Sequence, residues 1–365
     1  MKSSLLFPLI AIAAVCSARA AEYPKPTESP ASHFQGTCES DPDGRKFAER
    51  ACYTTYYPGD VGFGARYRPP TCDKKHKVSE KQKEMLAKAY ARAPDYVRAK
   101  LCRLTQLFVT RPTSGGPSGW GFWEGPDRPP GKGVYLAIAD RDLTSNKSVV
   151  DVENETVQRL LGVSDRSRRS RQSLLRLKSA EPSEPELAVL GEIAHELGHV
   201  LLADTNGDGV YANHPRRQVS GPPKSACFQD AFLNSSWEPD SFRKDMRRWV
   251  NFGEQYQNKA KNADAAFDLT RLKAAVRRGK LDAANDAISG VLGSEEFVSA
   301  LARSNADEDF VETFKYKVLA DAAPKLTIEL RLRGRDVNTL RLLDSGAVAK
   351  KVSCLRDLGL LSGTP

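Results

Sequence analysis

The sequence predicts an α+β fold with a small mixed sheet and a mainly helical C-terminal part. Two segments carry most of this prediction. Gly133–Ala139, GVYLAIA, combines β-branched, aromatic and aliphatic residues between a glycine and Asp140, which predicts a strand. Glu186–Asp208 begins with apolar residues interspersed with good helix formers, which predicts a mostly buried helix that ends near an Asn-Gly-Asp-Gly turn.

Caps and periodicity predict the remaining elements. Ser79 can cap a run of strong helix formers, so we expect a helix over Ser79–Ala93. Val97–Val109 extends this helix or leads into a strand, and the glycines and aromatic residues of Gly115–Gly125 predict a hairpin or wide loop. Later segments are predicted as a long loop at His214–Asp240, helices at Pro239–Gln257, Leu269–Arg278 and Leu281–Val291, a strand at Lys325–Leu332, and a terminal helix that holds Cys354.

Residues 1–20 have the pattern of a secretory signal peptide. Lys2 precedes an apolar run from Leu5 to Cys16, and Ala18-Arg19-Ala20 is a small-x-small cleavage site. We therefore expect a secreted or periplasmic protein whose mature chain begins near Ala21. No later segment reaches the ~20 apolar residues of a membrane span, so none is expected in the mature chain.

The charge balance is mildly basic, with a formal net charge of +9 over the whole chain. No basic stripe with interleaved aromatic residues accompanies this excess, so nucleic acid is not an expected partner. The densest basic cluster lies within Asp165–Lys178 and is predicted to be a solvated loop.

Of the seven cysteines, Cys16 leaves with the signal peptide and an even number remains. An even number in an exported chain favours disulfides over free thiols, although sequence alone cannot choose the connectivity. We expect segment 21–75, rich in Cys, Pro and Tyr, to be an N-terminal extension packed on the domain, with a substrate-covering lid or an inhibitory pro-segment as alternatives. The expected pairs are Cys38 with Cys52, Cys72 with Cys102, and Cys227 with Cys354.

His195 and His199 carry the chemistry of the predicted helix. Residues four apart share one helix face, so both imidazoles can point to a single metal ion. Glu196 completes the pattern H-E-x-x-H, in which two imidazoles bind zinc and the carboxylate acts as general base. Gly198 leaves room for a neighbouring element to approach closely, a reason to accept its helix cost of ~1 kcal/mol.

A catalytic zinc ion needs a third protein ligand. Six residues beyond His199 stands Thr205 instead of a further histidine, and Asp204 cannot readily curl back from the same helix. Glu308 and Glu312 are better candidates because they share a face of a helix that Ser304 or Asn305 can cap. The Phe and Val residues of that helix are expected to pack on the core while both carboxylates face a cation.

The two motifs, AHELGH at Ala194–His199 and EDFVETF at Glu308–Phe314, resemble those of the gluzincin zinc metallopeptidases. The similarity is greatest to peptidases akin to the anthrax lethal factor catalytic domain and related secreted bacterial proteins. This resemblance implies a zincin-like fold, with Glu308 as the third zinc ligand and Glu312 as the residue that supports Glu308 from behind. Residues 76–365 would then form the catalytic domain, with an upper part at 76–204 and a lower helical part at 205–365.

The expected function is that of a zinc-dependent endopeptidase that hydrolyses protein or peptide substrates. A zinc-activated water attacks the peptide carbonyl, and Glu196 takes its proton as general base. Two alternatives share the zinc site: a catalytically weak or inactive domain that binds a partner, and a cell-wall amidase. The oligomeric state is not predicted.

The resemblance is incomplete at the oxyanion donor. Such proteins often have a tyrosine seven residues before the zinc glutamate, and here that position is Leu301. Tyr211, His214 and Tyr316 are the alternative donors. An oxyanion donor contributes ~3 kcal/mol to catalysis, so this difference concerns rate more than metal binding.

Two further sites are expected around the zinc helix. The strand Gly133–Ala139 can form the sheet edge along which an extended peptide adds, with Trp120 and Trp123 lining a pocket or packing a hairpin. Downstream, a Gly-terminated helix end or an incomplete Ca²⁺ cage is expected, because position twelve of the calcium-loop pattern is Pro215. The residues with the spacing of calcium ligands are Asp204, Asn206 and Asp208.

Overall fold

The structure is a computed structural model of the whole chain. It describes residues 34, 38, 40–54, 71–111, 119–124, 133–163, 176–180, 184–206, 226–237, 269–304, 306–332 and 335–361. Within these ranges the chain combines many helices with one four-stranded sheet and one two-stranded hairpin. This mostly helical architecture with a small mixed sheet is compatible with the expected α+β fold, and the C-terminal part is mainly helical as predicted.

The four-stranded sheet has the order β1-β2-β4-β3. Its strands are β1 (Ala51–Thr54), β2 (Gln106–Thr110), β3 (Gly119–Glu124) and β4 (Gly133–Ala139). Strands β1, β2 and β4 run parallel to one another, and β3 runs antiparallel to β4. The predicted strand is therefore β4, but its expected place at the sheet edge is wrong. The glycine-rich segment before it folds back as β3, pairing Trp120 with Ala137, so β4 is enclosed and buried along its whole length.

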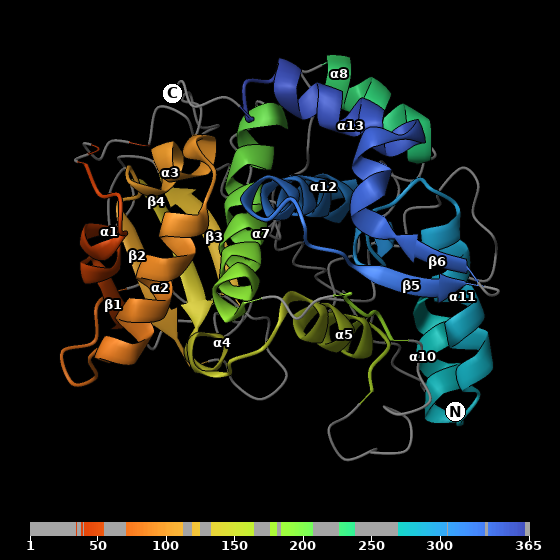
Figure 1. Cartoon of the computed structure of the whole chain (residues 1–365), viewed down its shortest axis with the longest axis horizontal. Helices are drawn as coiled ribbons and strands as arrows, with labels where there is room; N and C mark the ends of the chain where they lie inside the picture. Colours follow the sequence, from red (N-terminus) through yellow and green to blue (C-terminus); the bar gives the residue numbers. More distant parts are fainter. Residues whose placement is uncertain are drawn as a thin grey trace, which may run out of the picture.

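Three helices precede or cover this sheet: α1 (Arg45–Glu49), α2 (Glu80–Arg92) and α3 (Asp95–Leu101) (Figure 1). The helix expected at Ser79–Ala93 is confirmed as α2, and Ser79 and Gln82 form a reciprocal capping box at its start. The predicted N-terminal extension contributes α1 and β1, and its Phe47 and Tyr53 are buried in the main core. This part of the extension thus belongs to the sheet-bearing unit.

Three disulfides connect the described residues, and only one matches the expected pairing. Cys227–Cys354 is confirmed, whereas Cys38 pairs with Cys102 and Cys52 pairs with Cys72. The physical reason is visible at β1, where the chain after Cys72 returns alongside the strand. The Asp73 amide donates to the Tyr53 carbonyl at 2.7 Å, which brings Cys72 next to Cys52.

Two long helices lie at the centre of the molecule. The helix α7 (Pro185–Asn206) stands between the sheet and α12 (Ala306–Ala322), as Figure 1 shows. A Cβ atom on Gly198 would lie only 3.2 Å from a side-chain carbon of Val311 in α12. The predicted close approach at Gly198 is therefore confirmed, and it places the two helices in backbone contact. Shorter helices α4 (Asp140–Thr144) and α5 (Val149–Leu160) follow β4.

The C-terminal part confirms several predictions and changes others. The helices α10 (Leu269–Arg277), α11 (Leu281–Gly293) and α13 (Gly346–Asp357) lie where helices were expected, and α13 holds Cys354. Residues 226–237, expected in a loop, instead form α8 (Ala226–Phe228) and a π-helical turn η3 (Gln229–Asn234), because Phe228 and Phe232 pack into the core. The helix expected at Pro239–Gln257 lies outside the described residues.

The predicted strand at Lys325–Leu332 is shorter than expected. The observed strand, β5, covers Glu329–Leu332 and pairs with β6 (Arg335–Asn338) as an antiparallel hairpin. Short 3₁₀ segments η5 (Ala302–Ser304) and η6 (Thr339–Asp344) complete this region. Among the helices that the structure describes, none is long and apolar enough to cross a membrane.

Candidate metal centre

Two helices bring the predicted ligands together. The first, α7, presents His195 and His199 from adjacent turns, and α12 presents Glu308 from its first turn. One ligand atom from each of the three residues lies within 4.8 Å of the other two. All three side chains are largely buried, with 20% or less of their surface exposed. This group could hold a metal ion.

The two histidine donors have the spacing of a tetrahedral site. Their Nε2 atoms are 3.3 Å apart, and Glu308 approaches them with different oxygens, Oε2 at 3.7 Å from His195 Nε2 and Oε1 at 3.8 Å from His199 Nε2. Tetrahedral bonds of ~2.0–2.1 Å to a zinc ion place donors roughly 3.3–3.4 Å apart. Glu308 would therefore have to move closer to supply one oxygen to an ion held by both histidines, and a His-His-Glu set would leave one position of a four-coordinate ion open.

Glu312 fixes the orientation of His195. One of its carboxylate oxygens lies 2.8 Å from His195 Nδ1, and Glu312 itself is fully buried one turn beyond Glu308. When His195 donates its Nδ1 proton to this carboxylate, its Nε2 lone pair faces His199 and Glu308. The structure thus places Glu312 against His195, whereas the resemblance implies a carboxylate that supports Glu308.

The two histidines and the two glutamates change one another's pKa values. Burial lowers the pKa of His195, but the hydrogen bond with Glu312 and the charge of Glu308 outweigh burial and raise the pKa to about 10. Burial and the neighbouring His195 lower the pKa of His199 to about 3. Near neutral pH a metal ion would therefore compete with a proton on His195 rather than on His199.

The two glutamates are shifted in opposite directions. Burial raises the pKa of Glu308 to about 7. Burial acts in the same direction on Glu312, but Lys315 and His195 outweigh it and lower the pKa of Glu312 to about 2. Glu312 is consequently a fixed negative charge near neutral pH, whereas Glu308 gains most from a cation beside it.

Glu196, the candidate general base, lies against the edge of the sheet. It is 5% exposed, and a Cβ atom on Gly119 of β3 would lie 3.0 Å from its Oε1 atom and 2.5 Å from the Ala137 carbonyl oxygen. Glycine is therefore required where β3 passes this carboxylate. Gly119 is a functional position that was not predicted, although a glycine in a strand often marks such a close approach.

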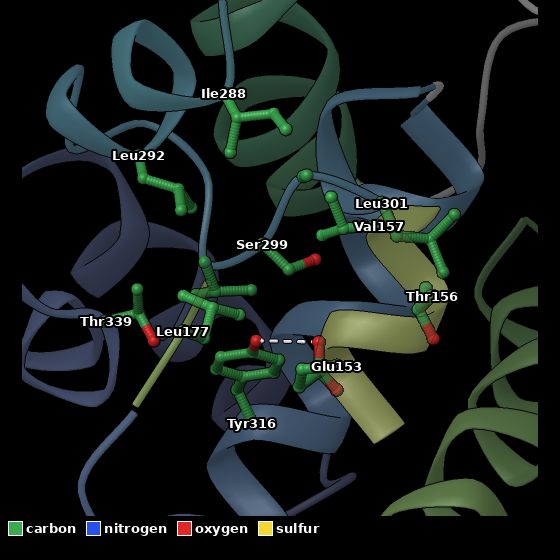
Figure 2. A pocket seen from close by; sticks show the side chains of 12 residues that line it. Glu153, Thr156, Val157, Leu177, Ile288, Leu292, Ser299, Leu301, Tyr316 and Thr339 are labelled. Atoms are coloured by element: carbon green, nitrogen blue, oxygen red, sulfur yellow. Dashed lines mark hydrogen bonds between the residues drawn. The ribbon is translucent and has the colours of Figure 1, made fainter. Parts of the chain in front are cut away.

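Within the described part of the chain, no candidate oxyanion donor lies beside the three candidate ligands. The Tyr316 hydroxyl donates to Glu153 Oε2 at 3.0 Å in a fully buried position, as Figure 2 shows. Leu301 lines the same small cavity as Tyr316. Tyr211 and His214 lie outside the described residues, as does Asp208 of the possible Ca²⁺ site. The other two residues of that site, Asp204 and Asn206, belong to the last turn of α7.

Three polar residues behind Glu312 were missed from the sequence: Glu153, Ser299 and Lys315. Ser299 Oγ donates to Glu312 Oε2 at 2.7 Å, and Lys315 Nζ lies between Glu312 and Glu153. A signal for Glu153 was present, because it falls four residues from both Val149 and Val157 on the buried face of α5. A charged residue on an apolar stripe predicts a buried partner.

Comparison of this chain with protein-family models, curated proteins and solved structures finds no match. The assignment of the site therefore depends on its own residues and geometry.

Proposed function

We propose that this protein is a zinc-dependent peptidase, a hydrolase of peptide bonds. The observation that carries the proposal is the convergence of His195, His199 and Glu308, with the carboxylate of Glu196 directly after the first ligand. A purely structural zinc site needs four protein ligands and no adjacent base, whereas a catalytic site keeps an open position. The resemblance of both motifs to those of gluzincins agrees with this choice.

The residues of the chain have separate parts in the proposed reaction. When bound, zinc supplies Lewis acidity and lowers the pKa of water towards ~7. Glu196 accepts the proton of the attacking water and returns it to the leaving amine. Glu312 accepts a hydrogen bond from the Nδ1–H group of His195, which keeps the lone pair of His195 Nε2 available to bind the metal.

The sheet edge supports a peptide as the substrate. Among the described strands, β3 pairs with β4 on one side only, and its Gly119 lies beside Glu196. An extended peptide can add to such an edge through main-chain hydrogen bonds, which would carry a peptide bond past the proposed base. The three disulfides further support the proposal that the protein is secreted or periplasmic.

A catalytically inactive zinc domain is the second candidate. It is favoured by one observation, the commitment of the Tyr316 hydroxyl to Glu153, which leaves the oxyanion donor unassigned among the described residues. The two candidates differ in what Glu196 does, because an inactive domain needs no general base.

Substitution of Glu196 by Gln tests the proposal. We expect Glu196→Gln to retain one zinc ion per chain but to lose peptide hydrolysis by at least ~10²-fold, because the amide cannot accept the proton. Metal analysis and digestion of a broad peptide library measure the two effects. Glu192→Gln is the matched control, since Glu192 lies one turn earlier on α7 with 8% exposure against 5%. Hydrolysis that survives in Glu196→Gln would rule out the proposed chemistry, and absence of hydrolysis by the wild type would favour the inactive domain.

A further inference from the structure

Behind the candidate metal centre lies a buried ion cluster that the proposed reaction does not use. Lys315 Nζ on α12 is 2.5 Å from Glu153 Oε1 on α5 and 3.1 Å from Glu312 Oε1. The side chains of these three residues are exposed by 6%, 3% and 0%. Two carboxylates and one ammonium group have thus been removed from water at the junction of two helices.

Every oxygen of Glu312 has a donor in this cluster. Oε1 lies 2.8 Å from His195 Nδ1 and 3.1 Å from Lys315 Nζ. Oε2 accepts from Ser299 Oγ at 2.7 Å and from Lys315 at 3.3 Å. Lys315 therefore contacts both oxygens of the carboxylate that orients His195. Loss of the ammonium group would remove one donor from each oxygen and leave Ser299 and His195 alone to hold the carboxylate, so the orientation of the imidazole would be less firmly fixed.

Glu153 holds Lys315 in this position. Its second oxygen accepts from the Tyr316 hydroxyl at 3.0 Å, so Glu153 is itself fixed from two sides, as Figure 2 shows for the tyrosine. The contacts form a continuous chain from Glu153 through Lys315 and Glu312 to His195. Because Lys315 and Glu312 are three residues apart on one helix, the pair moves with α12 as a unit.

Fold stability alone is a weak explanation for this cluster. Buried ion pairs rarely stabilise a protein more than apolar residues of the same volume, because removal of the charges from water offsets their attraction. The position of the cluster against a metal-ligand histidine gives it another use. Residues that support a metal ligand from behind typically change metal affinity 10- to 100-fold when they are replaced.

We propose that Lys315, anchored by Glu153, is a positioning residue that holds the Glu312 carboxylate in place as the hydrogen-bond acceptor of His195 and so sets the metal affinity of the site. The proposal rests on the metal site of the proposed function but not on peptidase activity. Lys315 pairs with Glu153 and Glu312, so its contact with the orientation of His195 runs through the Glu312 carboxylate.

The full chain tests this through a double-mutant cycle on zinc affinity. Zinc competition with a chelator, and the visible spectrum of the Co²⁺-loaded protein, are measured for Lys315→Met, Glu312→Gln and the double variant. We expect each single variant to lose roughly 10- to 100-fold in zinc affinity. The double variant should lose no more than Glu312→Gln alone, because both changes act on the same contact. The double variant also removes two of the buried charges together, which keeps the measurement possible if Lys315→Met folds poorly.

The matched control is Lys351→Met. Lys351 is a second fully buried lysine, paired with Asp309 at 2.7 Å and donating to the Glu296 carbonyl at 2.7 Å, and these partners do not orient a histidine. We expect Lys351→Met to lower the urea midpoint while its zinc affinity stays within threefold of the wild type. Equal affinity losses in both lysine variants, fully additive losses in the cycle, or an unchanged affinity and Co²⁺ spectrum in Lys315→Met would each overturn the inference alone. A wild-type chain that binds no zinc would overturn the metal site as well.

Discussion

Glu308 reaches the candidate centre from α12 and the two histidines reach it from α7, so Glu308 can be replaced without changing the helix that carries the histidines. Glu308 stands in the first turn of α12. Its backbone belongs to the helix, and its side chain extends to both histidines. We expect Glu308→Ala to lower zinc affinity by more than 100-fold, because it leaves only two protein donors. Isothermal titration with zinc measures this loss.

The control for Glu308→Ala is Glu84→Ala on the exposed face of α2, where the carboxylate pairs with Lys88. This control should bind zinc as the wild type does. Full zinc stoichiometry and affinity in Glu308→Ala would exclude Glu308 as the third ligand.

Asp142 in α4 is a residue whose charge opposes folding. Burial and the neighbouring Glu192 raise its pKa to about 6. The unfolded value is lower, near ~3.9, so the folded state binds the proton more tightly, and the stability from this group is lost as the pH rises from about 4 through 6. We therefore expect Asp142→Asn to raise the free energy of unfolding by up to ~3 kcal/mol at pH 7 and by much less at pH 4.

Urea denaturation of wild type and variant at both pH values gives this difference directly. Asp344→Asn, at an exposed position of η6, is the control and should change stability little at either pH. A gain for Asp142→Asn that is the same at pH 4 and pH 7 would contradict the assigned cause.

At the residue level, sequence reasoning reached the groups whose spacing carries chemistry. His195, His199 and Glu308 were identified because a four-residue repeat and a second acidic motif define their helix faces. The contact between Lys315 and Glu153 was not predictable, because it joins two helices and no local pattern pairs residues 162 positions apart. Gly119 was missed for the same reason, since the carboxylate beside it is on α7.

The candidate site depends on the contact between the helices α7 and α12. A Cβ atom on Gly198 would lie 3.3 Å from the Val311 Cα atom, so part of the obstruction is backbone that cannot turn away. We expect Gly198→Ala to destabilise the fold, because overpacking of ~1–3 kcal/mol exceeds the gain in helix propensity of ~1 kcal/mol. Urea unfolding of the metal-free protein measures the net effect.

Gly191→Ala on the same helix is the comparison. Its Cβ atom would lie 3.5–3.9 Å from Leu319 carbons, which is ordinary packing distance, so this variant should be neutral or stabilised by up to ~1 kcal/mol. Equal changes in the two variants would show that helix propensity, and not the approach of α12, decides the outcome.

Elements with strong local signals were predictable, and elements defined by their partners were not. The capping box at Ser79 and the apolar run at Gly133–Ala139 located α2 and β4 closely. The sheet order was not predictable, because only pairing with β3 shows that β4 is internal. The π-helical turn after Cys227 was expected as a loop, since its aromatic residues gain a helical conformation by packing against α12.

Across the whole molecule, the disulfides differ in how much chain they enclose. Cys227–Cys354 spans 127 residues and Cys52–Cys72 spans 20. We expect Cys227→Ala/Cys354→Ala to lower the free energy of unfolding by roughly 1.6 kcal/mol more than Cys52→Ala/Cys72→Ala, because the longer loop restricts the unfolded chain more. Urea unfolding without reductant measures both double variants, and an equal or reversed order would contradict this account.

The pairing of these cysteines marks the limit of prediction at this scale. Cys227 and Cys354 were paired correctly as the last two cysteines, but the first four were paired in chain order. The actual pairs follow from the return of the chain along β1 and from the position of Cys102 after α3. Such contacts depend on the tertiary course of the chain and have no sequence spacing of their own.

The two ligand-bearing helices, α7 and α12, are far apart in the sequence although they are in contact in space, and this has a consequence for biosynthesis. His195 and its supporting residue Glu312 are 117 positions apart, and the chain is made from the N-terminus. A nascent chain that has emerged as far as α7 carries both histidines and the base, yet it lacks the third donor and the carboxylate that orients His195. The site as proposed can therefore act only after translation of nearly the whole chain, so unfinished or truncated products would be made without the activity.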